Sequence, residues 1–339
     1  MKILKFVAAT LIAASTATSV LAADYELRFQ SSDPAGNPNF ELQQAWAKRV
    51  ATLTNDRVNV EMMPVGTIVQ HTETQDAVAA GIIDGHITDT SYFTGKDAAF
   101  GLIANPVGAY GSPSEMLNFM EYGGGKQMMN ELLNPYGLQF IGATTPGLEA
   151  FISKVPLDSV ADLKGLKMRA PEGLVQNVFA AAGATPVNLP GSEVFTALDK
   201  GVIDAADYTV FSTNHQQGMH DVAGHPVYPG FHSMPLIEVS INKATWDGMP
   251  LDVQAILEMS VRDYARDMTA QLSMRDAVAV AEAIADPDIT VHNWSAEERA
   301  KFRAIARTQW EIVAARSENA KRVYAVLTAY LTEQGLLGE

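Results

Sequence analysis

The 339-residue sequence contains no cysteine, so it can form no disulfide and can use no thiolate as a nucleophile or metal ligand. It also lacks the Gly-x-Ser-x-Gly, His-Glu-x-x-His and phosphate-loop motifs, which argues against the common hydrolases, metalloproteases and nucleotide-binding enzymes. Positive charge is scarce, and the formal charge of −15 argues against nucleic acid or an anionic membrane as a partner. Stability must come from burial, for which 47% hydrophobic residues are ample.

The N-terminus has the pattern of an export signal. Lys2 and Lys5 precede an apolar run over residues 6–14, and the small-residue sequence Val-Leu-Ala ends at Ala22. This pattern predicts a secretory signal peptide over residues 1–22 and a periplasmic location. A membrane anchor is the alternative, but the apolar run is shorter than the roughly 20 residues that span a bilayer. Cleavage would remove two lysines and change the formal charge from −15 to −17.

Apolar residues follow alternating strand and helix periods through most of the remaining sequence, which favours two doubly wound α/β lobes with a ligand cleft between them. We expect a signal peptide at 1–22, a first lobe at 23–147 plus 236–268, and a second lobe with C-terminal helices at 148–235 plus 269–339. The expected strands are 25–29, 58–62, 82–88, 137–143, 166–169, 185–188, 205–208 and 237–241, and the expected helices before residue 251 are 40–54, 75–80, 116–134, 173–182 and 192–200.

Arg169 is the most informative single residue. It ends a short strand just before Pro171, and α/β folds place ligands beyond the carboxyl ends of their strands. A planar guanidinium there is suited to holding a carboxylate by two parallel hydrogen bonds. A surface or salt-bridging arginine is the alternative.

Several segments in order resemble the solute-binding proteins of TRAP transporters, the DctP type. The matching segments are DLKGLKMR at 162–169, AGATPV at 182–187 and EVFTALDKGVID at 193–204, and the resemblance covers essentially the whole mature chain. YGGGK at 122–126 and YPG at 228–230 resemble the α-keto acid-binding branch. The glycine triplet is interpreted as a close-packing or helix-entry feature, because no strand immediately precedes it and no Lys-Ser/Thr pair follows.

The resemblance implies a closing two-lobe receptor that delivers a small organic carboxylate to a membrane permease, with Arg169 clamping the acid. In the keto-acid branch a cation bridges ligand and protein. Asp207 and Tyr208 match the acidic-aromatic pair that holds this cation, and Glu149 is the candidate upstream ligand. Two carboxylates favour Ca²⁺ over Na⁺. The alternative is that Glu149 faces solvent and no ion binds.

Three other residues are candidates for ligand contact. Ser233 stands where the branch usually has an acid, and His232 beside it offers a switchable hydrogen bond, so a hydroxy or keto acid fits. Tyr92 follows a predicted strand and is expected to wall the cleft, with burial in the core as the alternative. The histidines at 215, 220 and 225 are spaced by five, unlike zinc ligands, and are expected on the surface.

Keto-acid relatives pair through their C-terminal helices, so the apolar residues between Trp310 and Leu331 predict a homodimer, with packing on their own chain as the alternative. Two other functions remain open at this point. An exported acid/base lyase or isomerase would turn over its acid, and a sensory ligand-binding protein would dock on a membrane receptor. Turnover of a bound acid identifies the first, and a neighbouring gene for a multi-spanning permease separates transport from sensing.

Overall fold

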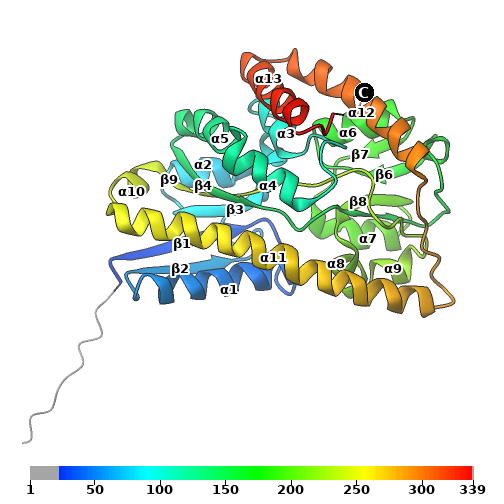
Figure 1. The fold of residues 1–339 in the computed structure, drawn as a ribbon. Helices are drawn as coiled ribbons and strands as arrows, with labels where there is room; N and C mark the ends of the chain where they lie inside the picture. The colour runs from blue at the N-terminus through cyan, green and yellow to red at the C-terminus, as the bar shows by residue number, and fades with distance from the viewer. Residues whose placement is uncertain (1–22, 338–339) are drawn as a thin grey trace, which may run out of the picture.

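The computed structural model describes residues 23–337, so the predicted signal peptide lies outside the described residues. Two β-sheets organise this part of the chain, each covered by helices (Figure 1). The first lobe is built around a five-stranded sheet and the second around a four-stranded sheet, as the alternating sequence pattern predicted. No helix within 23–337 combines the length and apolarity needed to cross a membrane.

The first sheet has the order β2-β1-β3-β9-β4. Strands β1 and β3 are parallel neighbours, so their carboxyl ends lie at the same edge, whereas β9 runs antiparallel to both β3 and β4. The late strand β9 confirms that the chain returns to the first lobe after building the second. The strands are β1 (Tyr25–Ser31), β2 (Val58–Met63), β3 (Gly85–Asp89), β4 (Leu138–Thr144) and β9 (Ile237–Asn242).

The second sheet has the order β5-β8-β6-β7. Strand β6 is parallel to both β7 and β8, while β5 is antiparallel to β8. The start of β5 therefore lies beside the end of β8, and the end of β6 lies close by. The strands are β5 (Ala150–Ser153), β6 (Lys167–Arg169), β7 (Thr185–Val187) and β8 (Ala205–Thr209).

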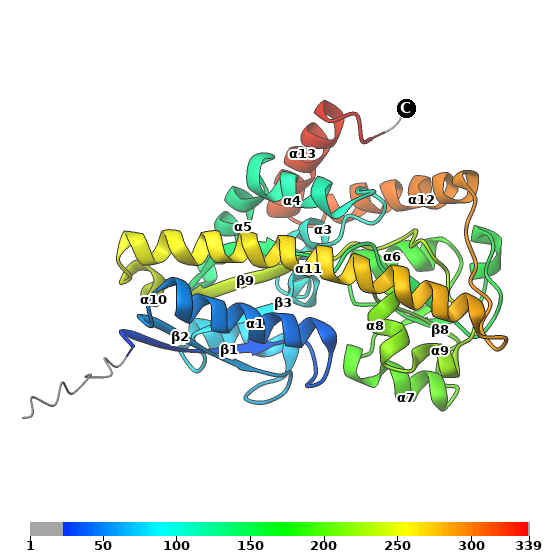
Figure 2. The ribbon, with the colours of Figure 1, turned by 60° about the horizontal axis from the view of Figure 1, so that its bottom comes forward.

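Helices cover both sheets, and the 35-residue helix α11 (Leu251–Ala285) runs along both lobes (Figure 2). It packs on β4 and α1 of the first lobe and on α8 of the second. The other helices are α1 (Pro38–Leu53), α2 (Thr74–Ala79), α3 (Ala98–Ala104), α4 (Pro113–Tyr122), α5 (Gly125–Leu133), α6 (Leu174–Ala181), α7 (Val194–Asp199), α8 (Phe211–Gln216), α9 (Met219–Val222), α10 (Lys243–Asp247), α12 (Ala296–Ala314) and α13 (Glu318–Glu333).

The C-terminal helices pack on their own chain. Helix α12 contacts α6 and α3, and α13 contacts α3 and α5, so α13 lies against elements of the first lobe. Trp310, Val323, Leu327 and Leu331, which motivated the homodimer prediction, are all buried in these contacts. These four residues therefore pack on their own chain, whereas Ile312 of α12 remains 51% exposed. The homodimer and the exact division of the chain into lobes stay predictions.

Three local expectations were wrong. The predicted helix over residues 116–134 is two helices, because Gly124 takes a left-handed conformation with φ of +94° and starts α5. The predicted strand 82–88 begins only at Gly85. The list of predicted strands omitted β5 (Ala150–Ser153). The expected helix-entry role of the glycine triplet is confirmed.

Candidate functional site

The candidate site begins where two parallel strands of the second lobe end. Arg169 is the last residue of β6 and pairs with Ala206 of β8, which places Asp207 immediately beside it. Both side chains are buried, with exposed fractions of 3% for Arg169 and 2% for Asp207. The sheet register, rather than a loop, therefore fixes the distance between this guanidinium and this carboxylate.

Two hydrogen bonds to backbone oxygens hold the Arg169 guanidinium. Its Nε donates to the Leu189 carbonyl at 3.0 Å, and its Nη1 donates to the Asp207 carbonyl at 2.7 Å. The same Nη1 lies 3.4 Å from Asp207 Oδ1. Tyr92 of the first lobe is a further side-chain partner of this guanidinium. The arginine is thus salt-bridged and also keeps donors for a ligand, so the two interpretations of Arg169 do not exclude each other.

Glu149 joins this pair from the start of β5, which runs antiparallel to β8. Its exposed fraction is 4%, so the alternative that Glu149 faces solvent is wrong. Burial raises the pKa of Glu149 well above its ordinary range, and the nearby Asp207 and Asp89 carboxylates raise it further. Two carboxylates in one buried pocket repel each other, so the pair favours a proton or a cation between them.

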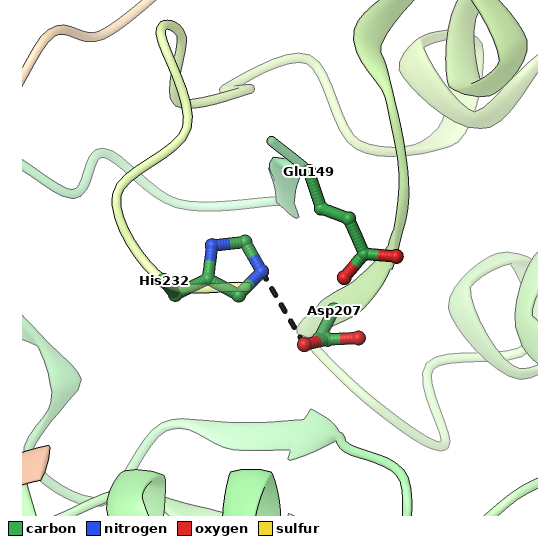
Figure 3. Close-up of side chains that lie close together, drawn as sticks. All are labelled: Glu149, Asp207 and His232. Atoms are coloured by element: carbon green, nitrogen blue, oxygen red, sulfur yellow. Dashed lines mark ion pairs between the residues drawn. The ribbon is translucent and has the colours of Figure 1, made fainter. Parts of the chain in front are cut away.

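His232 completes this cluster on the side of Asp207 (Figure 3). Its Nε2 lies 3.4 Å from Asp207 Oδ2, but the two atoms are not in hydrogen-bonding geometry, and both are buried without another partner in the described chain. Burial alone would raise the pKa of Asp207, but His232 and Arg169 together hold that pKa below its ordinary value. Asp207 is therefore the ionised member and Glu149 the readily protonated member of the pair.

The segment carrying His232 and Ser233 is anchored on both lobes. The Glu149 amide donates to the Ser233 carbonyl at 2.9 Å, and the Gly108 amide donates to the His232 carbonyl at 3.2 Å. Asn105 donates from its side chain to Ser233 Oγ at 2.5 Å. Ser233 and His232 lie behind the cleft and do not line it. Sequence reasoning missed Asn105, which no motif marks.

The first lobe supplies the opposite wall. Tyr92 lines the cleft, and its ring meets the ring of His71 edge to face with centroids 4.6 Å apart. Burial raises the pKa of Tyr92, and the charge of the neighbouring Arg169 opposes that shift. Tyr92 is thus a cleft residue and not a core residue.

Two first-lobe carboxylates also line the cleft, and sequence reasoning named neither as a site residue. Asp89 ends β3, and Asp33 lies two residues beyond the end of β1. Their position at the carboxyl ends of adjacent parallel strands is the signal that could have identified them. The enclosed space is about 50 Å³, and its lining also includes Glu149, Arg169 and Tyr208 from the second lobe.

The cluster has the chemistry of a hard-cation site. Ligand atoms of Glu149, Asp207 and His232 all lie within 4.8 Å of one another, and Asp207 Oδ2 is buried without a hydrogen-bond donor. Na⁺ and Ca²⁺ take carboxylate and carbonyl oxygens, and a cation here would relieve the repulsion that raises the pKa of Glu149. The donor set therefore fits such an ion, with the two carboxylates as the principal ligands.

The expectation that the histidines at 215, 220 and 225 lie on the surface is wrong in part. His220 is buried, with its Nδ1 3.1 Å from His215 Nδ1, and burial lowers the pKa of His220 to about 3. His225 pairs instead with His292, at 3.0 Å. The spacing of five brings two of these rings together across the turn between α8 and α9, which a single-helix argument cannot show.

Comparison with known proteins places this geometry in context. The sequence model of the bacterial extracellular solute-binding protein family 7, DctP, matches residues 29–317. A monocarboxylate 2-oxoacid-binding periplasmic protein of Nostoc sp. is 29% identical over 261 residues, which is 76% of this chain and 71% of that protein. The family match extends over the elements that carry the cleft.

Two solved structures are also similar. A TRAP periplasmic solute-binding protein from Rhodobacter sphaeroides, in an apo open state, is 64% identical with a TM-score of 0.77, covering 92% of this chain and 99% of that one. Another, from Colwellia psychrerythraea with bound calcium and pyruvate, is 25% identical with a TM-score of 0.81, covering 91% and 94%. Both structures cover more than nine-tenths of this chain, so the similarity includes both lobes.

Proposed function

Because the chain belongs to the bacterial extracellular solute-binding proteins of family 7, the periplasmic binding proteins of TRAP transporters, we propose that it captures a small keto or hydroxy monocarboxylate. The acid is held by Arg169, and the bound protein delivers it to TRAP permease subunits. The observation that carries this proposal is the buried Arg169, whose Nε and Nη1 are fixed by backbone carbonyls and whose side chain lines the cleft.

The enclosed cleft supports binding between closed lobes. Both lobes line a space of about 50 Å³, which suits an acid of a few heavy atoms. Ligand binding shifts such a receptor from open to closed states, and the permease distinguishes the two.

A bridging cation belongs to the same proposal. Glu149 and Asp207 would hold Na⁺ or Ca²⁺ through their carboxylates, together with the carbonyl of Tyr208 and oxygens of the ligand. When bound, the ion supplies positive charge to the ligand oxygens. The chain itself orients Asp207 through His232 and Arg169 and excludes water by burying all these side chains.

Isothermal titration calorimetry with pyruvate tests the proposal. We expect wild-type protein to bind pyruvate in the presence of calcium or sodium, and Arg169→Ala to weaken that binding by at least about a hundredfold, because a buried charge-assisted pair is lost. The matched control is Arg266→Ala, since the Arg266 side chain is 82% exposed. An unchanged affinity in Arg169→Ala would refute the assignment, and affinity indifferent to EDTA and to sodium removal would refute the ion.

We propose that the acid is bound without turnover, and that the exported lyase or isomerase does not describe this chain. NMR spectra of pyruvate recovered after prolonged incubation should show the unchanged acid. New resonances that require the protein and disappear in Arg169→Ala would favour the enzyme instead.

A homodimer remains a proposal, with a different surface from the one that the sequence suggested. Helix α11 exposes Met274, Val278 and Ile284, with exposed fractions of 74%, 59% and 68%. An apolar face of this kind is typical of an interface. Sedimentation at micromolar concentration should give a dimer mass for the wild type and a monomer mass for the Val278→Gln variant, and a wild-type monomer would reject the dimer.

A further inference from the structure

Two carboxylates face the ligand space from the first lobe. Asp33 and Asp89 both line the cleft that Arg169 lines from the second lobe. They come from β1 and β3, which are parallel neighbours whose carboxyl ends meet at one edge of the sheet. A ligand whose acid group is held by Arg169 therefore presents its other end toward these carboxylates.

Both carboxylates are fixed by their own lobe. Asp33 Oδ2 accepts a hydrogen bond from Gln43 Nε2 at 2.8 Å, and Asp89 Oδ1 accepts one from the Ser91 amide at 2.8 Å. Neither Asp33 nor Asp89 forms an ion pair within residues 23–337. Each is held in place through one oxygen and has no cation at ion-pair distance in the described chain, although the charge of Arg169 acts on Asp89 from farther away.

The charge balance of the cleft is negative. Arg169 is the only arginine or lysine among the described residues that line it, against the carboxylates of Asp33 and Asp89 and the readily protonated Glu149. A cation bound by Glu149 and Asp207 would offset the negative charge of these two second-lobe carboxylates. It would leave the charge of Asp33 and Asp89 in the first lobe uncompensated. Burial raises the pKa of both Asp33 and Asp89 to about 6, so each is ionised at neutral pH. Keeping a buried carboxylate ionised costs free energy. A hydrogen-bond donor on the ligand would reduce that cost.

We propose that Asp33 and Asp89 determine specificity, selecting a monocarboxylate whose far end carries a hydrogen-bond donor and rejecting a second carboxylate. The inference rests on the proposed function, in which Arg169 holds the first carboxylate. Within a space of about 50 Å³ a second carboxylate would lie close to two fixed negative charges of the same sign. A hydroxyl or ammonium group in the same place donates to the carboxylate oxygens.

Three probes of similar size separate these classes: pyruvate, hydroxypyruvate, which adds one hydroxyl, and malonate, which has a carboxymethyl group in place of the acetyl group of pyruvate and so carries a second carboxylate. Calorimetry with calcium at neutral pH should show hydroxypyruvate binding about tenfold more tightly than pyruvate, and malonate at least about a hundredfold more weakly than hydroxypyruvate. Malonate equal to or tighter than pyruvate in the wild type would overturn the inference without any variant.

The variants Asp33→Asn and Asp89→Asn should each reduce the ratio of the malonate dissociation constant to the hydroxypyruvate dissociation constant by about tenfold or more. Glu61→Gln is the matched control, because it removes one negative charge from an exposed position on β2 and should leave the ratio unchanged. Unchanged ratios in both aspartate variants would overturn the inference. If wild-type protein binds none of the probes and Arg169→Ala changes nothing, the proposed function itself fails, which is a different outcome.

Discussion

The Thr90 hydroxyl donates a hydrogen bond to Glu238 Oε2 at 2.6 Å, and both side chains are fully buried. Glu238 also contacts His86, whose Nε2 lies 2.7 Å from Oε1. Thr90 begins the short 3₁₀ turn Thr90–Phe93 that carries Tyr92 into the cleft. The returning strand β9 therefore fixes one wall of the candidate site through this carboxylate.

Replacing Thr90 by valine should lower the free energy of unfolding by about 1.5–3 kcal/mol, because a buried carboxylate loses a hydroxyl donor. Thr90→Ser keeps the hydroxyl, so its free energy of unfolding should stay close to that of the wild type. Urea unfolding of both variants measures the difference. Equal losses in the two variants would mean that the methyl group, and not the hydrogen bond, stabilises this turn.

The two cleft aspartates should make the ligand-free protein sensitive to pH. The folded-state pKa of Asp33 and Asp89 is about 6, above the ordinary 3.8, so both bind protons more tightly when folded. Their contribution to stability is fully present below pH 3.8 and is lost as the pH rises to about 6. The double variant Asp33→Asn/Asp89→Asn should therefore be more stable than wild type at neutral pH, by roughly 1–3 kcal/mol.

That advantage should shrink as the pH falls toward 4, since the wild-type aspartates are then protonated and neutral like the asparagines. Thermal unfolding at several pH values, without ligand or calcium, gives the difference between the two proteins directly. A stability difference between the two proteins that does not depend on pH would show that burial does not raise the pKa of these aspartates.

Calcium binding should strengthen as the pH rises. Burial and the neighbouring Asp207 raise the pKa of Glu149, so at lower pH a proton competes with the ion for this carboxylate. Calorimetry in buffers of different ionisation enthalpy should detect proton release when Ca²⁺ binds. Glu149→Gln cannot release this proton, so its calcium affinity should be weak and nearly independent of pH. Wild-type binding without proton release would contradict the role given to Glu149.

Gly230 has a steric role beside the site. A Cβ added there would lie 2.0 Å from the Glu149 carbonyl oxygen, a distance that requires the backbone to move. Gly230→Ala should therefore displace Glu149, weaken ligand and calcium binding, and destabilise the protein by about 1–3 kcal/mol.

Gly95→Ala is the control for this substitution, because a Cβ at Gly95 meets nothing within 4 Å. Melting temperature and pyruvate affinity should be close to wild type in that variant. Normal binding by Gly230→Ala would show that the backbone around Glu149 accommodates the added methyl group.

The two-lobe architecture could be predicted because it depends on periodicity along the chain. Alternating strand and helix patterns identified the strands of both sheets except β5, and also the returning strand β9. The boundary inside residues 116–134 was missed because the helical pattern continues across Gly124, where only the left-handed backbone reveals the break. The C-terminal helices were ambiguous for a related reason, since an apolar face does not specify what covers it.

The sequence by itself determined the family, the export signal as a prediction, and the strand-end position of Arg169, because each depends on residues close together in the chain. Only the tertiary structure decided which charges share the cleft. Asp33, Asp89, Glu149 and Asp207 come from four strand ends in two sheets, and their electrostatic balance around Arg169 arises from sheet register and from the way the two lobes face each other across the cleft. Charge interactions depend on distance in space, which local sequence patterns do not contain.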